Sequence, residues 1–137
     1  MTVLVRRFAA TTRTAEDAAR EIGTEVGRIV KSLVFIADGS AVVALCSGST
    51  RVDEAQLALA LKVRAVRRAN AEEAKTFTGF SIGGVPPFGH DCGVVMDESL
   101  LAYEVVWAAA GLPDAVFPIA PRDLARVAEA RVAPIAR

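Results

Sequence analysis

A lysine inside an apolar run is the first residue whose position suggests chemistry. Lys31 stands in the segment Ile-Val-Lys-Ser-Leu-Val-Phe-Ile, residues 29–36. Burying an ammonium group among such side chains is unfavourable unless the group reaches water or a partner. One interpretation is a side chain whose ammonium extends into water at a strand edge. The other is a cation aimed into a cleft, where it stabilises a developing oxyanion or holds a carbonyl group.

A segment rich in glycine and proline is the second candidate. Residues 79–90 read Gly-Phe-Ser-Ile-Gly-Gly-Val-Pro-Pro-Phe-Gly-His, a composition that predicts a loop. Glycines let a backbone approach a ligand and present N–H groups, and prolines fix the loop shape before binding. A rigid surface connection is the alternative, but the length, the apolar Val85 and Phe88, and the adjoining His90 favour a binding loop. The segment is neither a G-x-x-x-x-G-K-[ST] loop nor a G-x-G-x-x-G motif.

Single polar side chains near these segments have ordinary alternatives. His90 is the one histidine of the chain. Histidine is the commonest general base, but a lone histidine is more often a satisfied structural residue. Ser32, Thr78 and Ser81 are candidates for hydrogen bonds to a substrate, and the spacing supports no Ser-His-Asp triad.

Cysteines and carboxylates form no recognisable catalytic or metal-binding set, but a part for Cys92, which lies close to the candidate loop, stays open. Cys46 and Cys92 form no CxxC pair, and with a single histidine the supply of ligands predicts no metal site. Cys46 ends an apolar run and is interpreted as a buried small hydrophobe. Asp97 and Glu98 are adjacent in sequence, so on a strand they point to opposite faces and do not share an acid–base site.

The elements that position these residues follow from periodicity and from cap and turn signals. The segments predicted as strands are residues 2–8, 31–37, 41–46, 92–96, 104–109 and 115–120, with an Asp38-Gly39 hairpin turn after the second. Helices are predicted from Thr14 to about residue 21, after Asp53, after Asn70 with Glu73, and over residues 122–130 behind Pro121. The pattern predicts an α+β (mixed α/β) fold, with one mixed sheet of about six strands and three to four packed helices.

Composition limits the classes of protein that remain. The 137 residues suit a single domain over residues 1–137, and the hydrophobic content of 53% suits a real core. No apolar run reaches the roughly 18 residues of a membrane span. With 16 basic and 16 acidic side chains the chain is not a strongly basic nucleic-acid binder, although an RNA gripped locally is compatible with neutrality. The N-terminus has no leader pattern, so a cytoplasmic protein is expected.

Three segments together resemble the YbaK/ProX family. They are Thr-Ala-Glu-Asp-Ala-Ala at residues 14–19, Ile-Val-Lys-Ser-Leu-Val-Phe at residues 29–35, and the stretch from Thr78 to His90. The end of the chain, from Asp123 onward, is also similar to the family's ending. The family consists of the editing domain inserted in many bacterial prolyl-tRNA synthetases and of its free-standing relatives.

The resemblance implies a hydrolase that deacylates tRNA carrying a wrong amino acid such as alanine, cysteine, serine or threonine. It implies that Lys31 is the key catalytic residue and that residues 83–87 are the GxxxP loop that positions the aminoacyl ester. It further implies attack by water, assisted by a ribose hydroxyl of the terminal adenosine, with no cofactor and no metal. The residues expected to bind substrate are Ser32, Phe35, Thr78, Gly79, Ser81, Gly83, Gly84, Val85, Pro87, Phe88, Gly89 and His90. The amides of Gly83, Gly84 and Gly89 are expected to form an anion cradle, and Phe35, Val85 and Phe88 a small pocket.

The sequence departs from its relatives at three places. Many relatives carry a helix before the first strand, whereas two residues precede Val3 here, so this helix is absent or the start is truncated. Ser32 follows the lysine where other subgroups have Asn or Thr. Ala109 and Ala110 stand where some relatives have a serine before a Gly-Gly turn, so the amino acid specificity is open.

Partners and rival functions complete the expectation. The acceptor end of an aminoacyl-tRNA is the expected partner, with prolyl-tRNA synthetase and a homodimer as further possibilities and no membrane contact. A local basic cluster is either a solvated face or a contact to acceptor-stem phosphates. Its members are Lys62, Arg64, Arg67, Arg68 and Lys75. The rival functions are a non-catalytic tRNA- or synthetase-binding module and, last, a small-molecule esterase or amidase.

Overall fold

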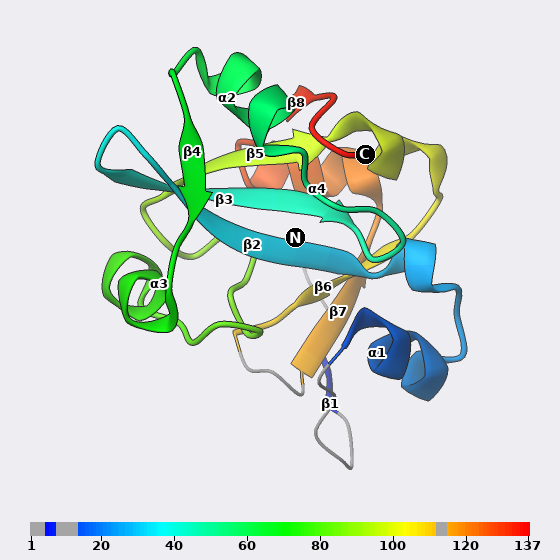
Figure 1. Cartoon of the computed structure of the whole chain (residues 1–137). Helices are drawn as coiled ribbons and strands as arrows, with labels where there is room; N and C mark the ends of the chain where they lie inside the picture. The colour runs from blue at the N-terminus through cyan, green and yellow to red at the C-terminus, as the bar shows by residue number, and fades with distance from the viewer. Residues whose placement is uncertain (1–4, 8–13, 112–114) are drawn as a thin grey trace.

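The computed structural model describes residues 5–7, 14–111 and 115–137, and within these it folds into two sheets with helices around them (Figure 1). The helices are α1 Ala15–Ile22, α2 Glu54–Leu61, α3 Ala71–Thr78 and α4 Pro121–Val127, with short 3-10 turns η1 Val26–Arg28 and η2 Glu98–Ala102. The strands are β1 Arg6–Arg7, β2 Val30–Ala37, β3 Ser40–Ser47, β4 Val66–Arg68, β5 Gly93–Asp97, β6 Val106–Ala109, β7 Ala115–Ile119 and β8 Arg131–Ala133. The expected α+β class is confirmed.

The larger sheet has the strand order β4-β2-β3-β5-β8 and is built on the β2–β3 hairpin. The hairpin turn is the predicted one, because Asp38 and Gly39 both take positive φ, at 50° and 78°. Strand β4 runs antiparallel to β2, while β5 and β8 are parallel to β3 and to β5 respectively. The sheet is therefore mixed, as expected.

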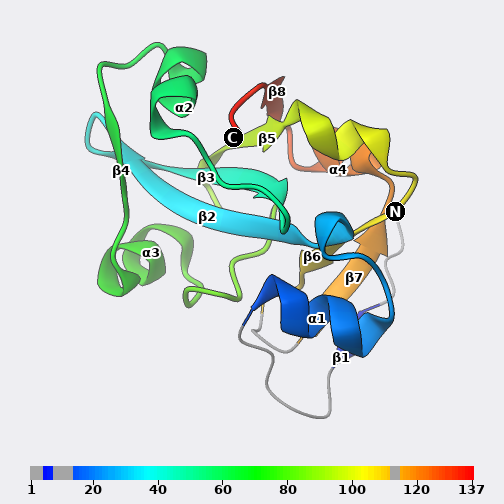
Figure 2. The ribbon, with the colours of Figure 1, turned by 45° about the vertical axis from the view of Figure 1, so that its right-hand side comes forward.

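The smaller sheet is antiparallel, with the order β1-β7-β6. It lies beside the first half of β2, and a parallel bridge between Ile29 and Trp107 connects the two sheets. Helix α1 lies beside the lower end of this sheet in both ribbon views (Figure 2). The expectation of one sheet is thus wrong: β1, β6 and β7 pair with each other and not with the larger sheet.

The starts of α1, α2 and α3 agree with the sequence prediction because each is fixed by a local hydrogen bond, whereas α4 begins at Pro121 without a side-chain cap. The side chain of Thr14 accepts from the N–H of Asp17, and Asp53 accepts from two N–H groups of α2. Asn70 and Glu73 form the reciprocal capping box at the start of α3. Helix α4 ends at Val127 and is shorter than the predicted 122–130 segment.

Two strands were not predicted. Strands β4 and β8 are three residues long each. Two exposed arginines make up most of β4 and one exposed arginine begins β8, so neither strand shows a run of alternating apolar residues. They exist because each pairs with a long buried neighbour, β2 or β5. Of the strand expected over residues 2–8, β1 is Arg6–Arg7, and residues 2–4 and 8 lie outside the described part of the chain.

The core occupies both faces of the β2–β3 hairpin. One cluster includes Val34, Leu45, Val85 and Met96, and packs under the glycine–proline loop and η2. The other includes Phe35 and packs under α2 and the C-terminal segment. None of the helices in the described residues is long and apolar enough to cross a membrane.

Candidate active site

The first half of β2 has an open edge, and the site is built on it. Strand β4 pairs with β2 only from Phe35 to Ala37, and the last contact is the bond from the Ala69 N–H to the Val34 carbonyl at 2.9 Å. Backbone groups alternate in direction along a strand, so those of Ser32 face the same side as those of Val34. Beyond β4 that side opens into a cleft of about 990 Å³, lined by both sheets, α1 and the loop.

Lys31 reaches the cleft from the paired strands. The register places it opposite Cys46 of β3, and its Nζ donates a hydrogen bond to the carbonyl of Thr50, in the turn after β3. Lys31 is half-buried and lines the cleft. Of the two interpretations that the sequence left open, the structure therefore shows a cation directed to a cleft and held by one carbonyl.

A turn after β3 can hold Lys31 because of Gly48. A Cβ atom added to Gly48 would lie 2.5 Å from the carbonyl oxygen of Val26, so any side chain would push this turn away from η1. The Gly48 N–H donates to the Ile29 carbonyl at 2.7 Å, which fixes the turn against the start of β2. The sequence reasoning did not single out Gly48, although a glycine directly after a strand is a signal for close backbone approach.

Ser32 presents a hydroxyl without a partner. Its Oγ is buried and makes no hydrogen bond in the structure, and the residue lines the cleft. Buried polar atoms are nearly always paired, because an unpaired hydroxyl costs about 1–3 kcal/mol. An unpaired hydroxyl in the wall of a cleft is therefore a candidate group for binding a ligand.

The glycine–proline loop contributes three of its residues to the cleft. They are Ile82, Gly83, with φ of 90°, and the buried Val85. The Gly84 N–H donates to the Ser81 carbonyl at 3.0 Å, so it is used within the loop. Of the three amides expected to form a cradle, that of Gly83 is the one that belongs to a cleft residue.

The other polar groups of the loop hold its shape. Thr78 Oγ1 donates to the Ala74 carbonyl at 2.6 Å and accepts from the Phe80 N–H, which ends α3. His90 Nδ1 accepts from the Cys92 N–H at 3.3 Å, so its Nε2 carries the proton that bonds the Pro86 carbonyl at 3.0 Å. Both ring nitrogens are occupied, which favours the structural interpretation of His90.

Several residues expected to bind substrate lie outside the cleft lining. Phe88 packs its ring on Phe117 at a centroid distance of 5.7 Å, and Phe35 is 1% exposed, in the core cluster under α2. The full set outside the lining is Phe35, Thr78, Gly79, Ser81, Gly84, Pro87, Phe88, Gly89 and His90. Their direct contact with a substrate stays a prediction.

The cleft also includes residues that the sequence did not single out as site residues. Trp107 lines it from β6, Glu16 from the first turn of α1, and Arg51 from the turn after β3. Ala109, noted as a departure from relatives, lines it as well. These residues are far apart in the chain, and no local pattern marks them as neighbours.

The cysteine opposite Lys31 has no exposed thiol. Burial raises the pKa of Cys46, and the charge of Lys31 opposes that rise in part. The thiol is fully buried, in agreement with its interpretation as a small hydrophobe. In the described residues, no group of three or more His, Cys, Asp or Glu side chains is placed to hold a metal ion.

Comparison with known proteins identifies the family. Residues 9–127 match the family described as the aminoacyl-tRNA editing domain. The chain belongs to this family. The resemblance stated from the sequence motifs is therefore confirmed, and the editing-domain match includes Lys31, Ser32 and the whole glycine–proline loop.

Individual relatives agree with the assignment to the editing-domain family. The uncharacterized protein YwhH of Bacillus subtilis is 32% identical over 131 residues, which cover 93% of this chain and 83% of that protein. The proline–tRNA ligase of Lactobacillus gasseri is 37% identical over 99 residues, but the match spans 18% of the ligase. A solved structure described as a candidate trans-editing enzyme for prolyl tRNA synthetase is 42% identical, with a TM-score of 0.92 over 98% of this chain and 87% of that one. An aminoacyl-tRNA editing function is thus supported.

Proposed function

We propose that this editing domain hydrolyses the ester of a mischarged aminoacyl-tRNA of the tRNA-Pro type, carrying a small wrong amino acid such as alanine, cysteine, serine or threonine. The observation that carries the proposal is the meeting of the Lys31 ammonium, the unpaired Ser32 hydroxyl and the Gly83 segment at one cleft. The family match and the trans-editing relative support the same reaction. The reaction would act on charged tRNA in the cytoplasm.

In the proposed reaction a water oxygen attacks the ester carbonyl carbon. The negative charge that develops on the carbonyl oxygen is stabilised by the Lys31 ammonium and by an N–H of the loop at Gly83. The bond between the carbonyl carbon and the ribose oxygen then breaks. The water proton passes to that ribose oxygen, and a free amino acid and an uncharged tRNA result.

The role of Lys31 follows from its anchoring. The hydrogen bond to the Thr50 carbonyl restrains a side chain with four rotatable bonds, so little freedom is lost when substrate binds. An ammonium has three donors, and this bond leaves the others for the substrate. Proton transfer is assigned to a ribose hydroxyl of the substrate, as the family resemblance implies, because His90 is engaged inside the loop.

The size of the aminoacyl group would be limited by the inner wall of the cleft. Val34 and Val85 are buried in it, and Ala109 and Trp107 continue it on β6. Such a wall distinguishes one methylene by only about 1–3 kcal/mol. A hydrolytic second sieve of this kind rejects large residues by exclusion, and the unpaired Ser32 hydroxyl adds a polar contact.

The test is deacylation of tRNAs charged with alanine, cysteine, serine, threonine and proline. We expect rapid loss of one mischarged species, sparing of prolyl-tRNA, and a rate reduction of about 10²–10³ in Lys31→Ala, the usual effect of removing an oxyanion donor. Lys75→Ala is the matched control, because Lys75 bonds the Gly79 carbonyl and lies outside the cleft lining. Full activity in Lys31→Ala would refute the role of Lys31. No turnover of any species by the folded protein, with tight binding of uncharged tRNA, would establish a binding module instead.

A further inference from the structure

A second, smaller hollow adjoins the cleft on the other face of β2. It has a volume of about 330 Å³ and is lined by Lys31, Leu33, Phe35, Arg51, Val52, Glu54, Arg68 and Arg137. Lys31, Leu33, Arg51 and Arg68 line both hollows, so the two are continuous around Lys31. Four of the eight lining side chains are cations, and Glu54 is the one acidic side chain among them.

The three arginines reach the hollow from distant parts of the chain. Arg68 ends β4, and its guanidinium lies 5.6 Å from the centre of the Phe35 ring. Arg51 and Arg137 are joined by two backbone hydrogen bonds, of 3.2 Å from the Arg51 N–H and 2.9 Å from the Arg137 N–H. Their backbones are thus fixed, although their side chains are exposed.

In their lack of a carboxylate partner these arginines differ from Arg20, Arg28, Arg67 and Arg126, each of which forms an ion pair. Arg67, next to Arg68, donates to both carboxylate oxygens of Glu73 at 2.8 and 2.7 Å. In contrast, none of Arg51, Arg68 and Arg137 forms an ion pair within the described residues. Gathering unpaired like charges is unfavourable, and a bound anion would relieve their repulsion.

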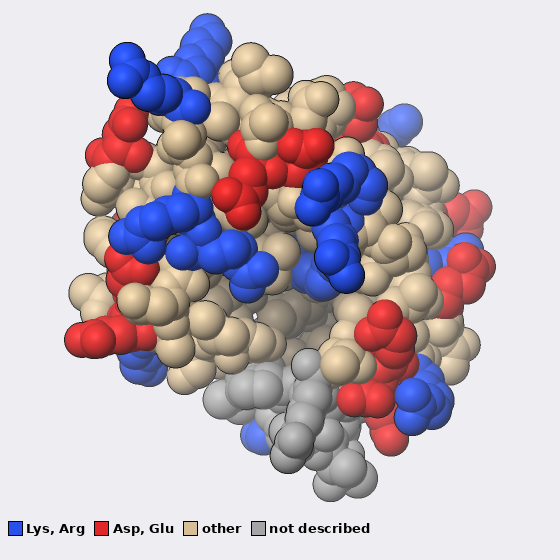
Figure 3. All heavy atoms as spheres, in the orientation of Figure 1, with Lys and Arg blue, Asp and Glu red and all other residues tan. Residues whose placement is uncertain are grey.

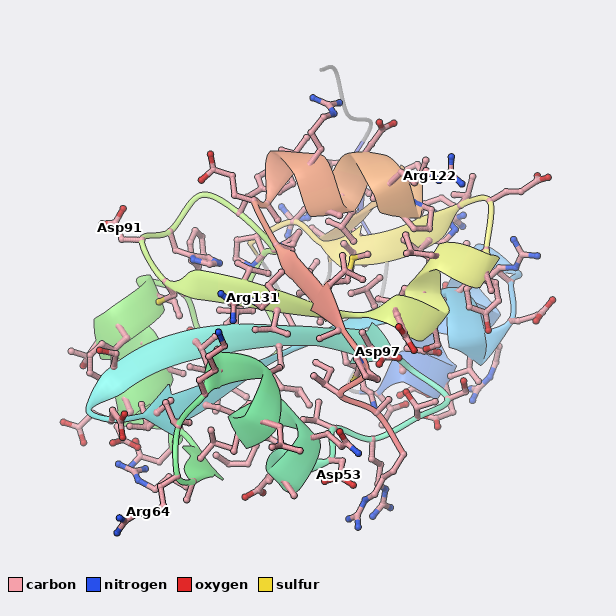
Figure 4. All side chains as sticks on the ribbon, turned by 90° about the horizontal axis from the view of Figure 1, so that it is seen from above. Asp53, Arg64, Asp91, Asp97, Arg122 and Arg131 are labelled. Atoms are coloured by element: carbon pink, nitrogen blue, oxygen red, sulfur yellow. The ribbon has the colours of Figure 1, made fainter. Side chains whose placement is uncertain are left out.

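The distribution of charge is visible on the surface. Figure 3 shows Lys and Arg side chains on both sides of a hollow near the middle of the face, with Asp and Glu side chains above it. The expected cluster of Lys62, Arg64, Arg67, Arg68 and Lys75 does not gather as a unit. Arg64 points away beyond the end of β4 (Figure 4), and Arg67 is paired with Glu73.

We propose that Arg51, Arg68 and Arg137 form an anion clamp that binds the phosphodiester backbone of the substrate's single-stranded 3′ end. This inference rests on the proposed function for its choice of RNA as the anion. Guanidinium groups suit phosphate because their planar forks donate two parallel hydrogen bonds. A strand held there would reach Lys31 at its terminal ester and direct its aminoacyl group toward Val85 and Trp107 in the larger cleft.

The clamp is tested by equilibrium dialysis of a labelled, uncharged RNA trinucleotide of sequence CCA. Replacing each clamp arginine by Ala should weaken binding by about three- to tenfold. It should also reduce the slope of log K against log salt concentration by about 0.7 per lost contact, the value for single strands. Arg122→Ala is the control, since it removes the same charge from the exposed surface of α4.

The design separates folding, ligand source and reaction. Arg68→Lys keeps the positive charge but loses the planar guanidinium, so its affinity for the trinucleotide should lie between those of wild type and Arg68→Ala. Thermal melts verify that each variant is folded. Unchanged binding and salt slope in all three Ala variants, or an equal loss in Arg122→Ala, would overturn the clamp. Inorganic phosphate that binds as tightly as the trinucleotide would also overturn it, in favour of a free-phosphate site. Absence of deacylation would refute the proposed function alone, because the binding measurement uses uncharged RNA.

Discussion

Ser32→Ala should make the free protein more stable and the enzyme less active. In the structure the Ser32 hydroxyl is buried without a hydrogen-bond partner. Such a group costs about 1–3 kcal/mol, which the substitution recovers. Two effects lower the stability of the variant, by about 0.3 kcal/mol each: the small void left by the missing oxygen and the lower strand propensity of alanine. The net expectation is about 0.5–2.5 kcal/mol of added stability.

The assay is thermal unfolding without ligand, with two serine variants as controls. For a domain of this size, 1 kcal/mol corresponds to about 3–4 °C, so Ser32→Ala should raise Tm by about 1.5–10 °C. Ser47→Ala should do the opposite, because the buried Ser47 Oγ donates to the Gly27 carbonyl at 2.7 Å and accepts from the Ser49 N–H at 3.2 Å. Ser40→Ala, at the exposed turn of the same hairpin, should leave Tm unchanged within about 0.5 kcal/mol.

The activity of Ser32→Ala gives the second half of the prediction. If the hydroxyl binds substrate, its loss should lower kcat/KM by about three- to tenfold, the effect of one neutral hydrogen bond. A Tm below wild type would show that the hydroxyl has a partner in the free protein and would refute the reasoning. A raised Tm with unchanged kcat/KM on every charged tRNA would support the stability prediction and refute the substrate contact, because the hydroxyl would then be unpaired in the free protein without binding substrate.

Two further predictions concern the framework around the site. Asp97→Asn should destabilise the fold by about 2–3 kcal/mol in denaturant unfolding. One oxygen of the buried carboxylate accepts from the Ile135 N–H at 2.9 Å and anchors the C-terminal segment to β5 (Figure 4), while the other accepts from the Ser99 N–H at 3.3 Å and from the Ser99 hydroxyl. An amide can keep the first bond but places an NH2 donor where the second oxygen accepts, and stability equal to wild type would contradict this. Glu73 has its pKa lowered from 4.5 to about 2, chiefly by the hydrogen bond from Arg67 and also by the backbone N–H of Asn70. Its contribution is therefore present above about pH 4.5 and lost as pH falls toward 2, so the Tm difference between wild type and Glu73→Gln should shrink over that range, and a constant difference would count against the pairing.

Local sequence signals determined the elements and the family of this protein. Helix caps and hairpin turns act through hydrogen bonds and dihedral preferences within a few residues, so they can be predicted from the sequence alone. This applies to the caps at Thr14, Asp53 and Asn70 and to the turn at Asp38. The unusual pairing of Lys31 in an apolar strand with a glycine–proline loop identified the family for the same reason, since both motifs are contiguous segments.

Tertiary structure alone decided which residues join Lys31, Ser32, Gly83 and Val85 in the cleft. The pairing of the short strand β4 with β2 stops at Phe35 of β2, which leaves the edge of β2 open at Ser32. Neither fact has a local signal, because each depends on pairing between distant strands. The division into two sheets, the placement of Trp107 in the same cleft as Lys31, and the convergence of Arg51, Arg68 and Arg137 have the same origin. Residue type states what a side chain can do, whereas long-range packing decides what it faces.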